Sequence, residues 1–244
     1  MHVPRKVGNR LALSCFVIIT LHLCAAAYAL DSTNASAFNY KVIKSVDLTK
    51  PFHTRSNWRF VVTQEPEPHS ELGEPGLIHF CFVRKGKPGC SEDTGPEFLA
   101  FNTLGRAEVV RPSGSGPLLM VTAMTYSGGP GSANPTTILW TYRSESDTFK
   151  RIFAQHSNRN NNEETRLMTR GPLAGDLVVS NAPTAAPYHY SISVYHLSES
   201  GKPVEILKYT GKTRYGDVDP RAVIDAEMPE IPRRLHLSKR ASSP

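Results

Sequence analysis

The polar run at residues 157–166 is the part of the sequence best suited to ligand recognition. It holds four asparagines, two arginines and two glutamates within ten residues. Amide and guanidinium groups hydrogen-bond readily to sugars, carboxylates and peptide backbone. Asparagine also tolerates the left-handed backbone of turns, so a long hairpin loop is the alternative interpretation. The composition therefore predicts either a recognition loop or a polar turn between two strands.

Aromatic side chains flank two other turn-like segments. Tyr126 precedes a glycine-rich stretch, and Tyr188 and Tyr190 follow a proline. Loops held by a rigid β scaffold often carry binding sites. If the three segments gather at one end of a sheet, they form a polar patch with aromatic platforms. The candidate ligand-binding residues are therefore Tyr126, Asn160, Asn161, Arg166, Tyr188 and Tyr190.

Recognisable catalytic and metal-binding motifs are absent from the sequence. The histidines show no His-x-x-x-His spacing, and no Gly-x-Ser-x-Gly nucleophile elbow occurs. The acidic group at residues 217–230 lacks the glycine and the ligand rhythm of a calcium loop. We therefore expect no metal, no cofactor and no catalytic residue. Enzymatic activity stays open, because the carboxylates of a hydrolase need not be near one another in sequence.

Cys81 and Cys90 are the two cysteines that follow the N-terminal apolar segment. They flank a Gly-Lys-Pro-Gly turn, and a strand that leaves Cys81 and returns near Cys90 brings their Cα atoms within disulfide range. Pairing is expected in an oxidising compartment and would stabilise the fold by about 2–3 kcal/mol. Two free thiols are the alternative.

The N-terminus has the three parts of a secretory signal peptide. Three basic residues precede an apolar stretch at residues 11–29, which ends in the small-x-small sequence Ala-Tyr-Ala. A segment of this kind is removed during export, so we predict cleavage after Ala29. An uncleaved anchor and lipid attachment at Cys24 are the alternatives. After cleavage we expect no membrane span and a periplasmic or extracellular protein.

The charge of the chain argues against nucleic acid as a partner. Residues 1–29 contain three basic residues and no acidic one, so their removal lowers the formal charge from +6 to +3. Duplex nucleic acid requires a concentrated Lys/Arg face, and the sequence shows none. The basic cluster at residues 233–240 is either a frayed end or a contact to anionic groups at a membrane surface. We expect an envelope protein or a glycan as partner.

Apolar and polar residues alternate over most of the chain, and prolines and glycines separate the runs. Period-two alternation rich in Val, Ile, Tyr, Phe and Thr predicts strands. A helix is expected only at residues 220–228. The expected strands lie at residues 40–46, 58–63, 77–84, 98–101, 107–111, 118–126, 136–143, 149–156, 164–169, 176–180, 188–197 and 204–209.

Hairpin-like segments recur along the sequence. The tripeptide Ser-Glu-Ser at residue 144 returns at residue 198, each time between two strand-like runs, and a third candidate hairpin surrounds the Cys81–Cys90 turn. Regular hairpins are typical of propeller blades, and also of an ordinary meander. The expected fold is all-β, an antiparallel meander of about 12 strands, partly propeller-like or a sandwich, with a short C-terminal helix.

Four segments follow from these features. They are a signal peptide at residues 1–29, a polar arm at 30–39, a single β domain at 40–232, and a basic, disordered tail at 233–244. We expect an exported, disulfide-stabilised binding or interaction protein of the cell envelope, its ligand undetermined. The alternatives are a secreted hydrolase with acid and base from separated loops, and a structural accessory protein of an envelope assembly.

Overall fold

The computed structural model describes residues 40–66, 75–87, 101–126, 133–157, 163–182, 188–215 and 222–235. Within these residues the chain forms eleven strands and three short helices. The strands build three separate antiparallel sheets, which do not close into a barrel. The prediction of an all-β fold is confirmed.

Each sheet is a meander of strands that are consecutive in the chain. Sheet A contains β1 (Lys41–Asp47), β2 (Trp58–Gln64) and β3 (Ile78–Arg84). Sheet B contains β4 (Thr103–Val110), β5 (Leu118–Tyr126), β6 (Ala133–Arg143) and β7 (Thr148–His156). Sheet C contains β8 (Glu164–Leu167), β9 (Leu177–Asn181), β10 (Tyr188–Leu197) and β11 (Pro203–Tyr215). The helices are α1 (Thr49–Phe52), α2 (Val223–Glu227) and α3 (Glu230–Arg234).

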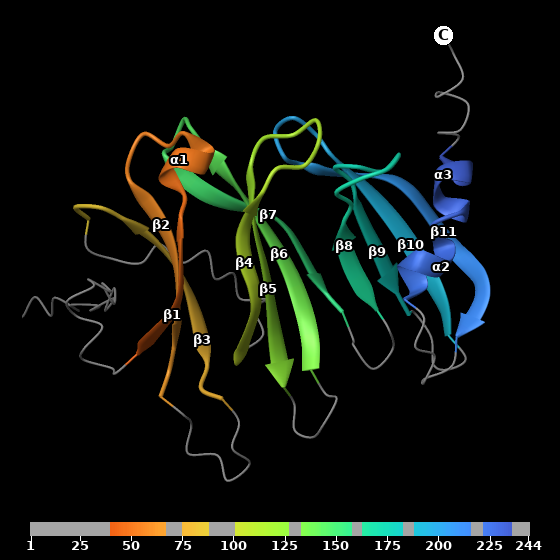
Figure 1. The fold of residues 1–244 in the computed structure, drawn as a ribbon, viewed down its shortest axis with the longest axis horizontal. Helices are drawn as coiled ribbons and strands as arrows, with labels where there is room; N and C mark the ends of the chain where they lie inside the picture. The colour runs from red at the N-terminus through yellow and green to blue at the C-terminus, as the bar shows by residue number, and fades with distance from the viewer. Residues whose placement is uncertain are drawn as a thin grey trace, which may run out of the picture.

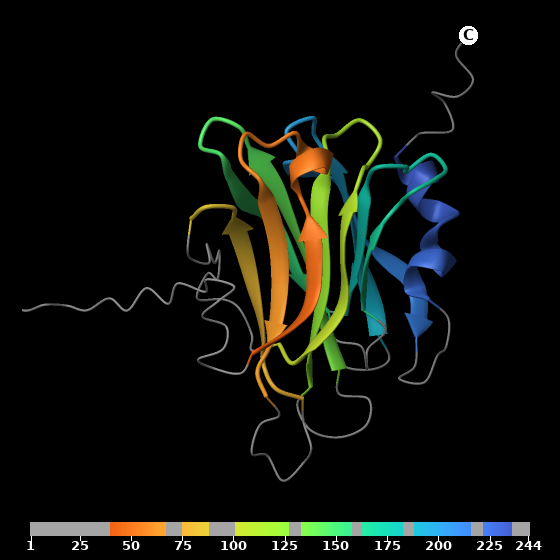
Figure 2. The same ribbon diagram turned by 60° about the vertical axis from the view of Figure 1, so that its left-hand side comes forward.

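The three sheets stack face to face in chain order, with sheet B between sheets A and C (Figure 1). The turned view shows the same layers, and α2 and α3 cover the outward face of sheet C (Figure 2). A sandwich has two sheets, whereas consecutive meanders stacked in series resemble neighbouring propeller blades. Of the two expected architectures, the described part of the chain is closer to the propeller-like one.

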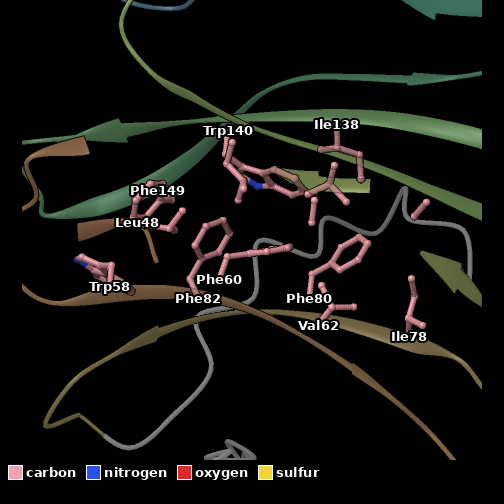
Figure 3. Packing of buried hydrophobic residues seen from close by; sticks show 14 of the residues in the cluster. Leu48, Trp58, Phe60, Val62, Ile78, Phe80, Phe82, Ile138, Trp140 and Phe149 are labelled. Carbon is pink, nitrogen blue, oxygen red and sulfur yellow. The ribbon is translucent and has the colours of Figure 1, made fainter. Parts of the chain in front are cut away.

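The core between sheets A and B is largely aromatic. Trp58, Phe60 and Val62 of β2 are buried, while Arg59 between them is exposed on the opposite face, as the period of a strand requires. Trp140 of sheet B is 1% exposed, and its ring centroid lies 5.8 Å from that of Phe60. Figure 3 shows Phe60 and Trp140 pointing toward one another between the two sheets. Aromatic contacts therefore hold sheet A on sheet B.

The other two interfaces between layers are mainly aliphatic. Leu118 of sheet B packs with Leu177 and Leu197 of sheet C, and all three have 0% exposed area. On the far side of sheet C, its buried side chains contact Ile224 of α2 and Ile231 of α3. Because each pair of adjacent layers shares buried residues, the sheets and the C-terminal helices form one continuous body.

Both Ser-Glu-Ser segments form hairpin turns, as the sequence predicts. The first turn connects β6 to β7 and ends at Asp147, whose φ is 49°. The second connects β10 to β11 and contains Gly201, whose φ is 77°. A Cβ atom at Gly201 would lie 3.0 Å from the Leu118 side chain, so the turn needs glycine for its conformation and for close packing. The third expected hairpin involves Cys90, which lies outside the described residues.

Several boundaries differ from the expected ones. Helix α1 forms a turn at residues 49–52, where the sequence predicts no helix, because four residues are too few to show helical periodicity. Strand β4 begins at Thr103 and β11 extends to Tyr215, both beyond the expected ends. The strand expected at residues 98–101 lies outside the described residues except for Phe101, whose backbone oxygen accepts a hydrogen bond from Ile78.

The described structure continues as a helix across residue 232, the predicted end of the β domain. The expected helix at residues 220–228 is α2, and the additional helix α3 includes Arg233 and Arg234. Arg234 Nε donates to Glu230 at 2.8 Å, and its guanidinium lies 4.3 Å from the centre of the Tyr209 ring. Ion pairing and cation–π contact thus hold the first residues of the predicted tail on sheet C.

Candidate functional site

The strand ends next to the predicted recognition loops lie at the same end of the stacked sheets, called here the loop end (Figure 1). Strand β5 ends at Tyr126 there, and β10 begins there at Tyr188. The antiparallel pairing places the ends of β7 and β9 at the same end of the sheets. Gln155 Nε2 on β7 donates to Asn181 Oδ1 on β9 at 3.3 Å, which joins sheets B and C there. The backbone therefore brings the ends of these segments together.

The six candidate ligand-binding residues do not share one role. Asn160 and Asn161 lie outside the described residues, so a recognition loop there stays a prediction. Tyr190 has no exposed area and packs in the core between sheet C and the helices, so its ring offers no platform to a ligand. Arg166 is committed to an ion-pair network. For Tyr126 and Tyr188 the structure gives only their places in β5 and β10.

The Arg166 network connects sheet C to α2. Arg166 Nε donates to Glu164 Oε1 at 2.6 Å, and its Nη2 donates to Glu164 Oε2 at 3.0 Å. Its Nη1 also donates to Asp225 Oδ1. The hydrogen bond to Asp225 raises the pKa of Arg166, burial opposes this shift, and Glu164 adds to it. The same contact with Arg166 lowers the pKa of Asp225. The Arg166 guanidinium therefore links β8 to α2.

A second polar cluster surrounds Asp147 where sheets A and B meet. Ser56 Oγ donates to the Asp147 carboxylate at 2.6 Å, and Trp58 Nε1 also donates to this carboxylate, at 3.0 Å. Tyr142 OH donates at 2.7 Å, and Arg84 Nη1 donates at 3.0 Å. Burial alone would raise the pKa of Asp147, but these four hydrogen bonds outweigh it and hold the pKa well below its ordinary value. The carboxylate is thus fully engaged and joins the β6–β7 turn to sheet A.

A groove of about 710 Å³ lies over the outward face of sheet A. Its floor is made by alternate residues of β2 and β3, because Val61 pairs with Cys81 and Arg59 pairs with Val83 across the two strands. A register shift between Val42 and residue 44 in β1 keeps Val42 on the same face. Cavities of this size are in the range that holds small ligands or short peptide segments.

The groove has an apolar floor and a basic end. Lys50 on α1, Arg59 at the start of β2 and Lys85 just after β3 are all exposed, and none forms an ion pair with a described residue. Among the described residues of the lining, Asp47 is the only acidic one, and its Oδ1 accepts a hydrogen bond from Thr49 N at 3.0 Å. Antiparallel order places the end of β1, the start of β2 and the end of β3 together, so the charges gather at one end.

Cys81 lies in the groove floor and is 2% exposed. Its expected disulfide partner, Cys90, lies outside the described residues. The disulfide therefore stays a prediction.

Two histidine–carboxylate pairs lie elsewhere on the molecule. His196 Nδ1 is 2.8 Å from Asp176 Oδ1, and His79 Nε2 is 2.8 Å from Glu65 Oε1. Burial raises the pKa of Asp176, and the contact with His196 opposes that shift. None of these four residues lines the groove, so neither pair combines with it into an acid–base site.

No protein-family model, curated protein or solved structure matches this chain. Among the described residues, no helix is both long and apolar enough to cross a bilayer. In that same part of the chain, no group of three or more His, Cys, Asp or Glu side chains is placed to hold a metal ion.

The groove is the feature that sequence reasoning missed. A strand with one solvated face usually alternates between apolar and polar residues, yet Val61 and Val83 occupy outward positions of β2 and β3. The sequence signal that could have indicated the groove is the presence of apolar residues at both inward and outward positions of the two adjacent strands β2 and β3. A strand buried on both faces has the same pattern, so the sequence alone does not distinguish an open apolar face from a covered one.

Proposed function

We propose that this protein is an exported binding protein of the cell envelope and that the groove on sheet A is its recognition surface. The observation that supports this proposal is the contrast between that face and every other sheet face. Both faces of sheets B and C, and the inward face of sheet A, pack against another layer of the described structure. The outward face of sheet A instead carries a groove with apolar residues and with cations that form no ion pair with a described residue.

The composition of the groove favours binding over hydrolysis. The described residues of its lining include one carboxylate, Asp47, and no histidine. General acid–base catalysis needs two titratable groups in reach of one bond, and glycoside hydrolysis needs two carboxylates. Lysine and arginine over an aliphatic floor provide orientation and affinity but no proton acceptor for such a reaction.

Export is the second part of the proposal, and the N-terminal sequence supports it. The basic residues, the apolar stretch and the Ala-Tyr-Ala end suit a signal peptidase, so the mature protein would begin at Leu30 in the periplasm or outside the cell. Intact mass measured without reductant should equal residues 30–244 less two hydrogens if Cys81 and Cys90 are paired. A mass that includes residues 1–29 would contradict cleavage, and two alkylatable thiols would contradict the disulfide.

Affinity capture from an envelope extract tests the binding function. The baits are the mature protein, a groove variant Val61→Arg/Val83→Arg, and a control Val204→Arg/Ile206→Arg. Val204 and Ile206 are exposed apolar residues of β11, 47% and 43% exposed, and lie outside the groove. We expect a partner that the mature protein and the control retain and the folded groove variant loses. Equal capture by all three baits, or by none, would contradict the groove as the recognition surface.

The loop end of the sheets is a second candidate surface, favoured by the contact between Gln155 and Asn181 that joins two sheets there. A bait with Asn160→Ala/Asn161→Ala distinguishes it from the groove. Loss of the partner from this bait alone would move the recognition surface to the loop end and leave the binding function in place.

A further inference from the structure

Resting on the proposed binding function, we infer that the groove recognises an extended polypeptide segment of another protein, acidic at one end and aliphatic at the other. The basic part and the apolar part of the groove follow one another along the strands of sheet A. Arg59 marks the basic end of β2 and pairs with Val83 of β3, and Val61 and Thr63 of β2 continue the lining away from it. Successive outward positions of a strand are about 6–7 Å apart, so a few residues of an extended partner span both parts.

The basic end selects for negative charge on the partner. Lys50 lies on α1, Arg59 on β2 and Lys85 just after β3, and Asp47 is the one opposing charge among the described residues of the lining. Arginine forms bidentate hydrogen bonds with carboxylates. Lysine adds a positive charge whose hydrogen bonds are less restricted in direction. A partner segment with two or three carboxylates close together would balance the excess positive charge, whereas a basic segment would be repelled.

The floor favours a polypeptide over an anionic glycan. Its side chains beyond the basic end are aliphatic or small, and they suit aliphatic side chains of a partner. Trp58 is the aromatic residue among the described residues of the lining, but it is 5% exposed and its Nε1 donates to Asp147. Its ring therefore presents little face for stacking on a sugar. An uncharged aliphatic surface next to a group of cations matches a segment with carboxylates at one end and aliphatic side chains at the other.

Fluorescence anisotropy with a defined peptide tests this inference on the mature chain, residues 30–244. The probe is a labelled, acetylated and amidated twelve-residue peptide with three glutamates followed by alternating valine and threonine. An otherwise identical peptide with three glutamines is the uncharged comparison, and an oligoglucuronate of equal charge represents the glycan. We expect the glutamate peptide to bind, and to bind about tenfold or more tightly than the glutamine peptide or the oligoglucuronate.

Charge reversal locates the binding. In Lys50→Glu/Arg59→Glu/Lys85→Glu, affinity for the glutamate peptide should fall by about tenfold or more. The matched control Lys202→Glu/Lys208→Glu/Lys212→Glu makes the same change in net charge at exposed positions on or beside β11 and should retain the affinity. Thermal unfolding of both variants verifies that they are folded. Equal losses in the two variants would indicate unspecific attraction by net charge and overturn the inference.

Other results also overturn the inference, and they separate it from the proposed function. Tighter binding of the oligoglucuronate would assign the groove to a glycan. Absence of peptide binding, with capture from the envelope extract still dependent on Val61 and Val83, would retain the binding function and reject the partner class. Peptide binding only after Glu92→Gln/Asp93→Asn/Glu97→Gln would mean that acidic residues of this same chain compete for the groove.

Discussion

The outward faces of the two outer sheets differ in what covers them. On sheet C, Tyr190, Ile192 and Val194 of β10 have no exposed area, because α2 and α3 lie over them. Polar contacts hold those helices in place: Arg166 pairs with Asp225, and Tyr209 OH donates to Glu227 at 2.9 Å. On sheet A, no described element covers the corresponding face, and a groove occupies it.

The difference shows what a sheet face needs in order to be closed. Strand β10 of sheet C presents only apolar or aromatic side chains to the helices. The polar contacts of the helices, Arg166–Asp225 and Tyr209–Glu227, come from the neighbouring strands β8 and β11. Sheet A places Arg59 and Lys85 among its valines, and covering such cations without partners would cost several kcal/mol each. Sheet A is instead fixed from its inward side, by the aromatic core and by the hydrogen bonds to Asp147.

The largest effect is expected when the cover of sheet C is weakened. Ile224→Ala removes a fully buried side chain between α2 and sheet C, which should lower the free energy of unfolding by about 2–5 kcal/mol. The control is Val42→Ala at the groove, where the side chain is 54% exposed and the loss should stay within about 0.5 kcal/mol. Urea unfolding monitored by circular dichroism measures both. Similar losses would mean that the two faces are equally covered.

The next effect concerns the anchor on the inward side of sheet A. Asp147→Asn removes the charge that four hydrogen bonds stabilise and should lower the free energy of unfolding by about 1.5–3 kcal/mol near neutral pH. Because the folded pKa of Asp147 is depressed below the unfolded value of about 3.9, its contribution is complete above about pH 5 and declines as the pH falls.

Urea unfolding of wild type and Asp147→Asn between pH 7 and pH 2.5 measures that dependence. The stability difference between the two proteins should shrink toward acid pH. Asp47→Asn, at the exposed rim of the groove, serves as the control and should change stability far less. A difference for Asp147→Asn that does not depend on pH would show that its carboxylate is not the stabilising group.

A smaller effect is expected for the ion pair that clamps α2. Asp225 is 63% exposed, so water screens its attraction to Arg166. A double-mutant cycle with Arg166→Met and Asp225→Asn should give a coupling free energy of about 0.2–1 kcal/mol, decreasing with added salt. A coupling as large as the loss in Ile224→Ala would mean that the ion pair, and not the apolar packing, closes the face of sheet C.

The sequence predicts the strands better than it predicts the surfaces. The expected bounds of β5 and β10 agree with the structure, since both are long alternating runs between turn residues. Helices α1 and α3 were missed because each is about one turn long and contains a proline, Pro51 or Pro232, which disfavours a helical reading. Local pattern therefore accounts for the all-β class and for most strand positions.

Long-range contacts account for what the sequence did not predict. Tyr190 resembles a surface aromatic in sequence, but the helices that bury it follow about thirty residues later in the chain. Arg166 meets Asp225 from 59 residues away, a pairing that no local pattern indicates. The groove depends on which face of sheet A stays uncovered, and no local pattern specifies this.

Methyl NMR of valine-labelled protein comprising residues 30–244, titrated with the glutamate peptide, compares the two faces in one experiment. Val61 and Val83 report on the groove of sheet A, and Val178 and Val194 report on the covered face of sheet C. Binding in the groove predicts saturable shifts at the first pair and unchanged resonances at the second. Shifts confined to Val178 and Val194, or none at any of the four, would contradict the groove on sheet A as the recognition surface.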